Sequence, residues 1–119
     1  MGDVFVSVII PHYNQKEYLP DAVDSVLRSS FPYYEIIIVD DCSTQEGAVE
    51  VVKRLSKNNN RVRCLFNKNN MGLSFTRNRG IKEAKGRYIL PLDSDDMISP
   101  DCLMKMYKAI QFLKFDIIS

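Results

Sequence analysis

The feature that most constrains the fold is a series of short apolar segments that each end in polar residues. The first covers residues 4–10, and the next two cover residues 35–39 and 62–66. A fourth runs from residue 87 to 92. β-Branched and apolar residues on both alternating faces indicate strands that are covered on both sides, as in a parallel sheet. We expect Pro11 to end the first strand.

Helical patterns separate these strands. Apolar residues at helical spacing predict four helices, at about residues 16–29, 48–55, 74–84 and 103–113. Pro20 should lie in the first turn of its helix and Gly86 should cap the third helix. Residues 115–118 are expected to begin a fifth strand. The alternation predicts a three-layer α/β/α sandwich with a mostly parallel sheet and right-handed crossovers.

Length and composition indicate one ordinary globular domain over residues 1–119. The 16 Lys and Arg residues nearly balance the 15 Asp and Glu residues, which argues against a nucleic-acid partner. The three cysteines form no C-x-x-C pair and are expected to be unreactive thiols. No segment has the pattern of a transmembrane helix or signal peptide, so we expect a cytoplasmic location, including the inner face of the membrane. Because the chain stops at Ser119, in the middle of the expected fifth strand, we expect it to be truncated.

Polar segments follow three of the predicted strands, at residues 11–14, 40–43 and 93–96. The carboxyl ends of parallel strands lie along one edge of the sheet. In open parallel sheets the ligand crevice lies beyond that edge, where the order of the strands reverses. We therefore expect the three segments to converge on one site.

Three carboxylates, those of Asp93, Asp95 and Asp96, lie within four residues after the fourth strand. Carboxylates this close repel one another unless a cation or protons neutralise them. Hard divalent cations prefer oxygen ligands and bind one or two carboxylates together with phosphate oxygens and water. The alternative is a solvated turn before a helix that Ser99 or Asp101 caps.

Two further carboxylates, those of Asp40 and Asp41, follow the second strand. Ionised carboxylates are hydrogen-bond acceptors, so one of them can bind a base N–H or a ribose hydroxyl. The alternative is that Asp41 or Ser43 caps the next helix. Both roles are compatible with the same loop.

Four more side chains bear on the expected site. Arg77, near the start of the third helix, suits an anion such as phosphate. Arg79 points about 200° away from it on a helix and is expected at the surface. Tyr13 either stacks on a base or packs into the core. His12 is the only histidine, has no partner at metal-ligand spacing, and is expected in a loop or at the surface.

Together these segments resemble the family 2 glycosyltransferases of the GT-A fold. The matching segments are residues 8–14 (VIIPHYN), 35–44 (EIIIVDDCST), 70–81 (NMGLSFTRNRGI) and 84–96 (AKGRYILPLDSDD). Four segments in this order are specific evidence for the family, whereas any one of them alone would be weak evidence. The resemblance covers the chain from about residue 6 to its end. It implies a Rossmann-like GT-A nucleotide-binding half.

The resemblance implies binding of a nucleotide diphosphate sugar, with a UDP-sugar as the expected donor. Asp93 and Asp95 match the Asp-x-Asp motif, whose acids hold Mn²⁺ or Mg²⁺ against the diphosphate, with Ser94 between them. Asp95 is expected to be the closest ligand. Asp41, with Asp40 beside it, matches the acid that contacts the base or ribose. The other positions that match nucleotide-sugar-binding residues or frequent acids of the family are Pro11, Tyr13, Asn14, Glu17 and Arg77.

The resemblance also implies inverting transfer to a hydroxyl of a glycan or lipid-linked acceptor. In this family the general base is an acid downstream of the metal motif, so we expect it beyond Ser119. We therefore assign no catalytic residue within the chain, which should bind donor but transfer little or nothing. An uncovered sheet edge would favour a homo-oligomer.

Other classes fit less well. A dinucleotide-binding oxidoreductase requires G-x-G-x-x-G after the first strand, and residues 11–16 contain no glycine. A signalling receiver domain carries its paired acids after the first strand, whereas here they follow the second. A non-catalytic nucleotide-binding, metal-binding or scaffolding domain stays open as the alternative.

Overall fold

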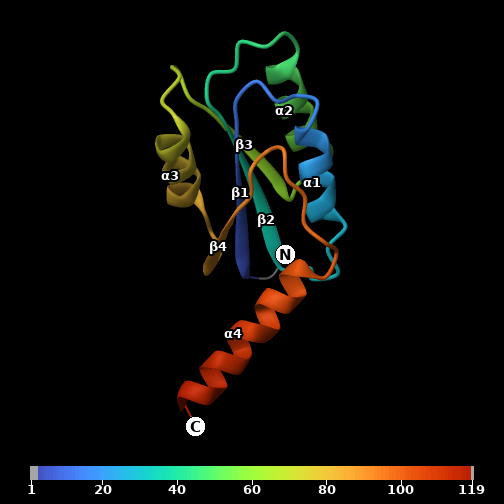
Figure 1. Cartoon of the computed structure of the whole chain (residues 1–119), viewed down its shortest axis with the longest axis vertical. Coiled ribbons are helices and arrows are strands. Elements are labelled where there is room, and N and C mark those ends of the chain that lie inside the picture. Colours follow the sequence, from blue (N-terminus) through green and yellow to red (C-terminus); the bar gives the residue numbers. More distant parts are fainter. Residues whose placement is uncertain (1–2, 119) are drawn as a thin grey trace.

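A four-stranded parallel sheet forms the centre of the molecule (Figure 1). The computed structural model describes the backbone of residues 3–118 and the side chains of residues 3–114. The strands are β1 (Val6–His12), β2 (Tyr34–Asp40), β3 (Val62–Phe66) and β4 (Tyr88–Pro91). They lie in the order β3-β2-β1-β4, and every pair of neighbours is parallel.

Helices cover both faces of this sheet. The helices are α1 (Leu19–Leu27), α2 (Ala48–Asn58), α3 (Leu73–Glu83) and α4 (Cys102–Ile118). Figure 1 shows α1 and α2 on one side of the sheet, α3 on the other, and α4 extending away from the end of the sheet. The predicted three-layer α/β/α arrangement with a parallel sheet is therefore confirmed.

The two faces of the sheet bury separate sets of apolar side chains, because consecutive residues of a strand point to opposite faces. Val8 and Ile10 belong to the larger core, which includes apolar side chains of α1 and α2. Ile9 belongs to a smaller core with Ile37 and Val39. Gly80 of α3 lies directly over Ile9, so α3 covers this second core. Burial on both faces is what the apolar strands predict.

Pro11 does not end β1, and that prediction was wrong. The strand continues to His12, and Pro11 pairs with Val39 of β2. On the other side, β4 already ends at Pro91, which pairs with Ile9. A proline removes a ladder hydrogen bond only where a neighbouring strand needs its N–H. Because β4 stops before this point, Pro11 extends the strand at no such cost.

The role predicted for Gly86 was also wrong. Helix α3 ends at Glu83 with Ala84 in an extended conformation, and the described glycines with positive φ are Gly47 and Gly72. Gly86 instead allows two segments to approach closely. A Cβ atom at this position would lie 2.6 Å from the backbone nitrogen of Ser7 in β1.

The predicted fifth strand does not form. Residues 115–118 are the last turn of α4. Three apolar residues interrupted by Asp116 fit a helix or a strand equally well, so the preceding helix decides the outcome. The other helices and strands agree with prediction to within a few residues, and Pro20 lies in the first turn of α1. None of the helices in residues 3–118 has the length and apolar character needed to cross a bilayer.

The close packing at Gly86 predicts that Gly86→Ala destabilises the fold by about 1–3 kcal/mol, because the added methyl group meets backbone that cannot move aside. Urea denaturation would measure the change in unfolding free energy. Lys82→Ala, at an exposed position of α3, is the matched control and should change it by less than about 0.5 kcal/mol. Equal stability of the two variants would contradict the assigned role of Gly86.

Self-association stays a prediction. Strands β3 and β4 form the two edges of the sheet, and neither has a second strand partner in the described part of the chain. Unpaired edge strands favour contact between copies. Sedimentation velocity should therefore detect dimers or larger species at high concentration, and a strict monomer would contradict the prediction.

Candidate functional site

The strand order reverses at β1, since the chain builds β2 and β3 on one side of it and β4 on the other. Ligands of open parallel sheets bind beyond the carboxyl ends of the strands at such a reversal. A cavity of about 470 Å³ lies there. Small-molecule sites typically have roughly 300–1,000 Å³. The cavity therefore has both the position and the size of a ligand site.

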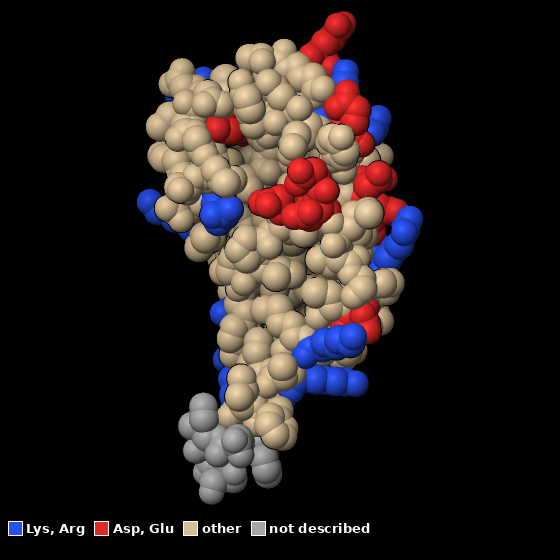
Figure 2. Space-filling model, in the orientation of Figure 1, with Lys and Arg blue, Asp and Glu red and all other residues tan. Residues whose placement is uncertain are grey.

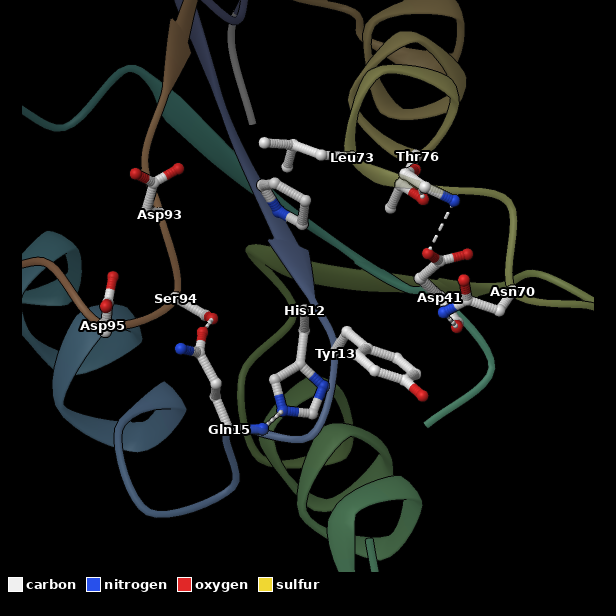
Figure 3. Close-up of a pocket in the computed structure, with 12 residues that line it drawn as sticks. His12, Tyr13, Gln15, Asp41, Asn70, Leu73, Thr76, Asp93, Ser94 and Asp95 are labelled. Carbon is white, nitrogen blue, oxygen red and sulfur yellow. Dashed lines mark hydrogen bonds between the residues drawn. The ribbon is translucent and has the colours of Figure 1, made fainter. Parts of the chain in front are cut away.

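Six of the predicted site residues line this cavity, and Figure 3 labels all of them except Pro11. They are Pro11, Tyr13, Asp41, Asp93, Ser94 and Asp95. They come from the ends of β1, β2 and β4, so the predicted convergence of the three polar segments is confirmed. Four predicted residues are not among those that line the cavity, namely Asn14, Glu17, Asp40 and Arg77.

The acidic turn, residues 93–96, contains three exposed carboxylates. Asp93, Asp95 and Asp96 each place an oxygen within 4.8 Å of the other two. The backbone N–H of Asp96 donates to the carbonyl of Asp93 at 3.0 Å, which closes the turn. Figure 2 shows a compact group of acidic side chains on this face of the molecule.

This turn fits a hard divalent cation. The three carboxylates take part in none of the ion pairs among the described residues. Their mutual repulsion is therefore offset by none of these ion pairs, and a cation with oxygen ligands would offset it. Asp96 was not predicted as a ligand, although its place beside Asp95 in the sequence was the available signal.

Asp41 fixes the loop that precedes α3. Its Oδ1 accepts hydrogen bonds from the Met71 N–H at 2.7 Å and the Asn67 amide at 2.9 Å. Its Oδ2 accepts one from the Gly72 N–H at 2.9 Å. Burial raises the pKa of Asp41, but the hydrogen bonds from Met71, Asn67 and Gly72 outweigh it and hold that pKa below its ordinary value. The carboxylate is therefore ionised at neutral pH.

Asp40 turns inward. His12 Nδ1 lies 2.8 Å from its Oδ1, and the hydroxyl and N–H of Ser43 donate to it at 2.7 and 2.9 Å. Burial raises the pKa of Asp40, but the hydrogen bonds from His12 and Ser43 outweigh it and lower the pKa. Asp40 thus serves the internal structure of the loop, and its carboxylate is already bonded within the protein.

His12 is not in a surface loop, and that expectation was wrong. It is the last residue of β1 and only 1% of its surface is exposed. Sequence spacing could not reveal this, because the partner of His12 is Asp40, which lies 28 residues away and is brought alongside by strand pairing.

Asn14 and Glu17 connect the loop after β1 to the loop after β2 by hydrogen bonds. Asn14 has a left-handed backbone (φ 54°), which asparagine tolerates better than most residues. Its Oδ1 accepts the N–H groups of Thr44 and Gln45, each at 2.8 Å. The Glu17 carboxylate accepts the Gln45 amide at 3.0 and 3.1 Å. Both side chains therefore support the cavity from outside it.

Arg77 lies in the second turn of α3, because that helix begins at Leu73. Its Nε is buried and has no hydrogen-bond partner among the described residues. Arg79 was expected at the surface, but it is half-buried and donates to Asn67 Oδ1 at 2.9 Å. Asn67 also binds Asp41, so Arg79 supports the loop that Asp41 holds.

Some residues that line the cavity were not predicted. They are His12, Gln15, Asn70, Gly72, Leu73 and Thr76. Asn70 and Gly72 belong to a turn-rich loop whose composition was a usable signal. Gln15 and Thr76 gave none, since their role depends on the packing of separate loops.

The fold and the site define a parallel α/β domain with a ligand cavity at its switch point and an acidic turn suited to a divalent cation. The chain belongs to glycosyl transferase family 2, whose family model matches residues 7–119. The resemblance seen in the sequence is thereby confirmed.

Similar proteins support the same family. A Bacillus subtilis protein named as a teichuronic acid biosynthesis glycosyltransferase, TuaG, is 41% identical over 108 residues, which are 91% of this chain and 41% of TuaG. The structure of S. aureus TarS in complex with UDP-GlcNAc matches at 31% identity and a TM-score of 0.83, covering 91% of this chain and 31% of that one. The chain thus spans less than half the length of these relatives.

A more distant structure shows the fold alone. The mannosyltransferase PcManGT from Pyrobaculum calidifontis, in complex with GDP-Man and Mn²⁺, matches at 22% identity and a TM-score of 0.77. The match covers 86% of this chain and 31% of PcManGT.

The lowered pKa of Asp41 predicts a pH-dependent stability. A carboxylate with a depressed folded pKa stabilises the fold above its unfolded pKa of about 4, and this contribution is lost as pH falls through the folded pKa. Asp41→Asn should therefore lower the unfolding free energy at pH 7 by about 1–3 kcal/mol and reduce its loss on acidification. Urea denaturation from pH 7 to 3 would measure both effects.

Asp21→Asn is the control for this prediction, because Asp21 is exposed. Its unfolding free energy at pH 7 should stay within about 0.5 kcal/mol of that of the unsubstituted chain. If Asp41→Asn also stayed within this range, the hydrogen bonds of Asp41 would not have the assigned importance.

Proposed function

We propose that this chain binds a nucleotide diphosphate sugar, specifically a UDP-sugar, together with Mn²⁺ or Mg²⁺ in the switch-point cavity. It is the donor-binding part of an inverting glycosyltransferase. The observation that carries the proposal is that Asp41 and the acidic turn line one cavity. Figure 3 shows Asp93 and Asp95 on one side of it and Asp41 on the other. A nucleotide diphosphate sugar has a base at one end, and its doubly charged diphosphate lies on the other side of the ribose, next to the sugar.

The base and ribose belong at the Asp41 end. Both carboxylate oxygens of Asp41 accept protein hydrogen bonds, but Oδ2 accepts only that of Gly72 among the described residues. A carboxylate oxygen has room for a further donor, such as a base N–H or ribose hydroxyl. Tyr13 also lines the cavity, and 44% of its surface is exposed, so its ring is available for stacking.

The diphosphate belongs at the acidic turn. Asp93 and Asp95 would hold the cation, with Asp96 within reach of it. The cation supplies charge neutralisation for the departing diphosphate. The protein's own part is to hold these carboxylates in one place and to fix the nucleotide at the opposite end of the cavity, so that the sugar is presented in one orientation.

The choice of UDP is supported by TarS, whose structure contains UDP-GlcNAc. TuaG is named for teichuronic acid biosynthesis, which supports polysaccharide biosynthesis as the process and a glycan or lipid-linked acceptor. We propose that the general base lies beyond Ser119. The chain covers 41% of TuaG and 31% of the TarS chain, and both relatives therefore include much sequence that this chain does not.

The alternative is a non-catalytic nucleotide-binding, metal-binding or scaffolding domain. Donor hydrolysis distinguishes the two. A longer protein that contains this domain should release UDP from a UDP-sugar only when Mn²⁺ or Mg²⁺ is present. Tight binding without any release or transfer would favour the alternative.

Binding itself is testable with this chain. Calorimetry should detect binding of UDP in the presence of Mn²⁺, and Asp95→Asn should weaken it at least about tenfold, since even partners of metal ligands contribute that much. Glu50→Gln, an exposed acid in α2, is the control and should bind as the unsubstituted chain does. An absence of heat with every common nucleoside diphosphate, using folded protein, would refute the proposal.

A further inference from the structure

The acidic turn is tied to the loop after β1 by one side-chain contact. The hydroxyl of Ser94, which lies between the two proposed metal ligands, donates to Gln15 Oε1. Ser94 is 2% exposed, so water does not readily replace this bond. Among the described residues it is the one hydrogen bond that connects residues 93–96 to another part of the chain. Figure 3 shows the two side chains meeting at the side of the cavity.

Gln15 is itself held firmly. Its backbone N–H donates to His12 Nε2 at 3.2 Å. Its carbonyl accepts the N–H groups of Tyr18 and Leu19, at 3.1 and 3.0 Å, where α1 begins. The side chain that reaches Ser94 therefore starts from a backbone anchored both to β1 and to α1.

The imidazole of His12 has one possible hydrogen-bonding pattern. A backbone N–H can only donate, so Nε2 must be the acceptor and carry no proton. The ring proton is then on Nδ1, which donates to Asp40 Oδ1 at 2.8 Å. Ser43 holds the Asp40 carboxylate in turn. A continuous series of hydrogen bonds thus runs from the end of β2 through β1 to the acidic turn.

We propose that Gln15 is a positioning residue for the metal-binding turn, and that the buried His12–Asp40 pair fixes its place. This inference rests on the proposed function, because it assigns a role toward the cation. Asp93 and Asp95 are exposed and repel each other, and the hydrogen bond that closes the turn joins backbone atoms of Asp93 and Asp96 without holding either carboxylate. The Gln15–Ser94 bond keeps the backbone between them in place. Partners of this kind contribute roughly 10- to 100-fold to metal affinity.

The test compares UDP affinity with and without Mn²⁺. Gln15→Met keeps the length and backbone contacts of the residue but removes the acceptor for Ser94. The ratio of the UDP affinity with Mn²⁺ to the UDP affinity without it should be at least about tenfold smaller in Gln15→Met than in the unsubstituted chain. UDP affinity without metal should change less than about twofold, because the nucleotide end of the cavity is untouched.

Two further variants separate positioning from general loosening. Ser94→Ala removes the same bond from the other side, so the double variant should lose no more of the Mn²⁺-dependent gain than Gln15→Met alone. Gln45→Met is the matched control. Gln45 also joins the loops after β1 and β2, through Glu17 and Lys16, but does not contact Ser94. It should leave the Mn²⁺-dependent gain unchanged.

Two measurements need no ligand. Amide hydrogen exchange at Asp96, whose N–H donates to the Asp93 carbonyl, should become about tenfold faster in Gln15→Met and stay unchanged in Gln45→Met. The chain has one histidine, so ¹⁵N NMR of the imidazole reports His12 alone. It should show a proton on Nδ1 and none on Nε2 at neutral pH.

The outcomes distinguish this inference from the proposed function. If the unsubstituted chain fails to bind UDP with Mn²⁺, the proposed function fails, while the exchange data still decide whether Gln15 orders the turn. Normal Mn²⁺ dependence and normal exchange in Gln15→Met would overturn the role of Gln15. A proton on Nε2 would overturn the role of His12. An equal loss of the Mn²⁺-dependent gain in UDP affinity in Gln45→Met and Gln15→Met would overturn the specific role of Gln15 and show a general loosening of the loops instead.

Discussion

Burial of β1 and β2 on both faces is the constraint on which the rest of the structure depends. Every residue of these two strands is buried, so neither of their faces is open to a ligand. The polar residues that line the cavity lie at the carboxyl edge, where parallel pairing brings the ends of β1 and β2 into register, with His12 opposite Asp40. Since β4 joins on the other side of β1, the acidic turn meets the same edge. The site is therefore a consequence of how the sheet is packed.

The carboxylates at this edge have two different environments. Asp40 and Asp41 are buried, and hydrogen bonds from neighbouring loops offset the cost of burial and keep them ionised. Asp93, Asp95 and Asp96 are exposed and have no ion-pair partner among the described residues. The buried pair organises the cavity, whereas the exposed group is left available for a cation. Chemically identical side chains thus acquire different roles from their burial and from the hydrogen bonds that neighbouring loops supply.

Several sequence predictions failed where a distant segment decided the outcome. Pro11 continues β1 because β4 ends opposite Ile9, two residues earlier, and Gly86 is needed for close approach to Ser7, not for ending a helix. His12 is buried because strand pairing supplies Asp40 as its partner. In each case local spacing gave no information about the neighbour that mattered.

The sequence by itself determined the alternation of strands and helices, the three-layer sandwich, and the convergence of residues 11–14, 40–43 and 93–96 on one edge. These follow from apolar periodicity and from the rules of parallel sheets, which act over short stretches of chain. Tertiary structure alone decided that Asp41 faces the cavity while Asp40 turns inward, and that Gln15 meets Ser94. The physical reason is that the direction of a side chain at the end of a strand depends on hydrogen bonds from other loops. Those partners are distant in sequence and are brought close only by the completed fold.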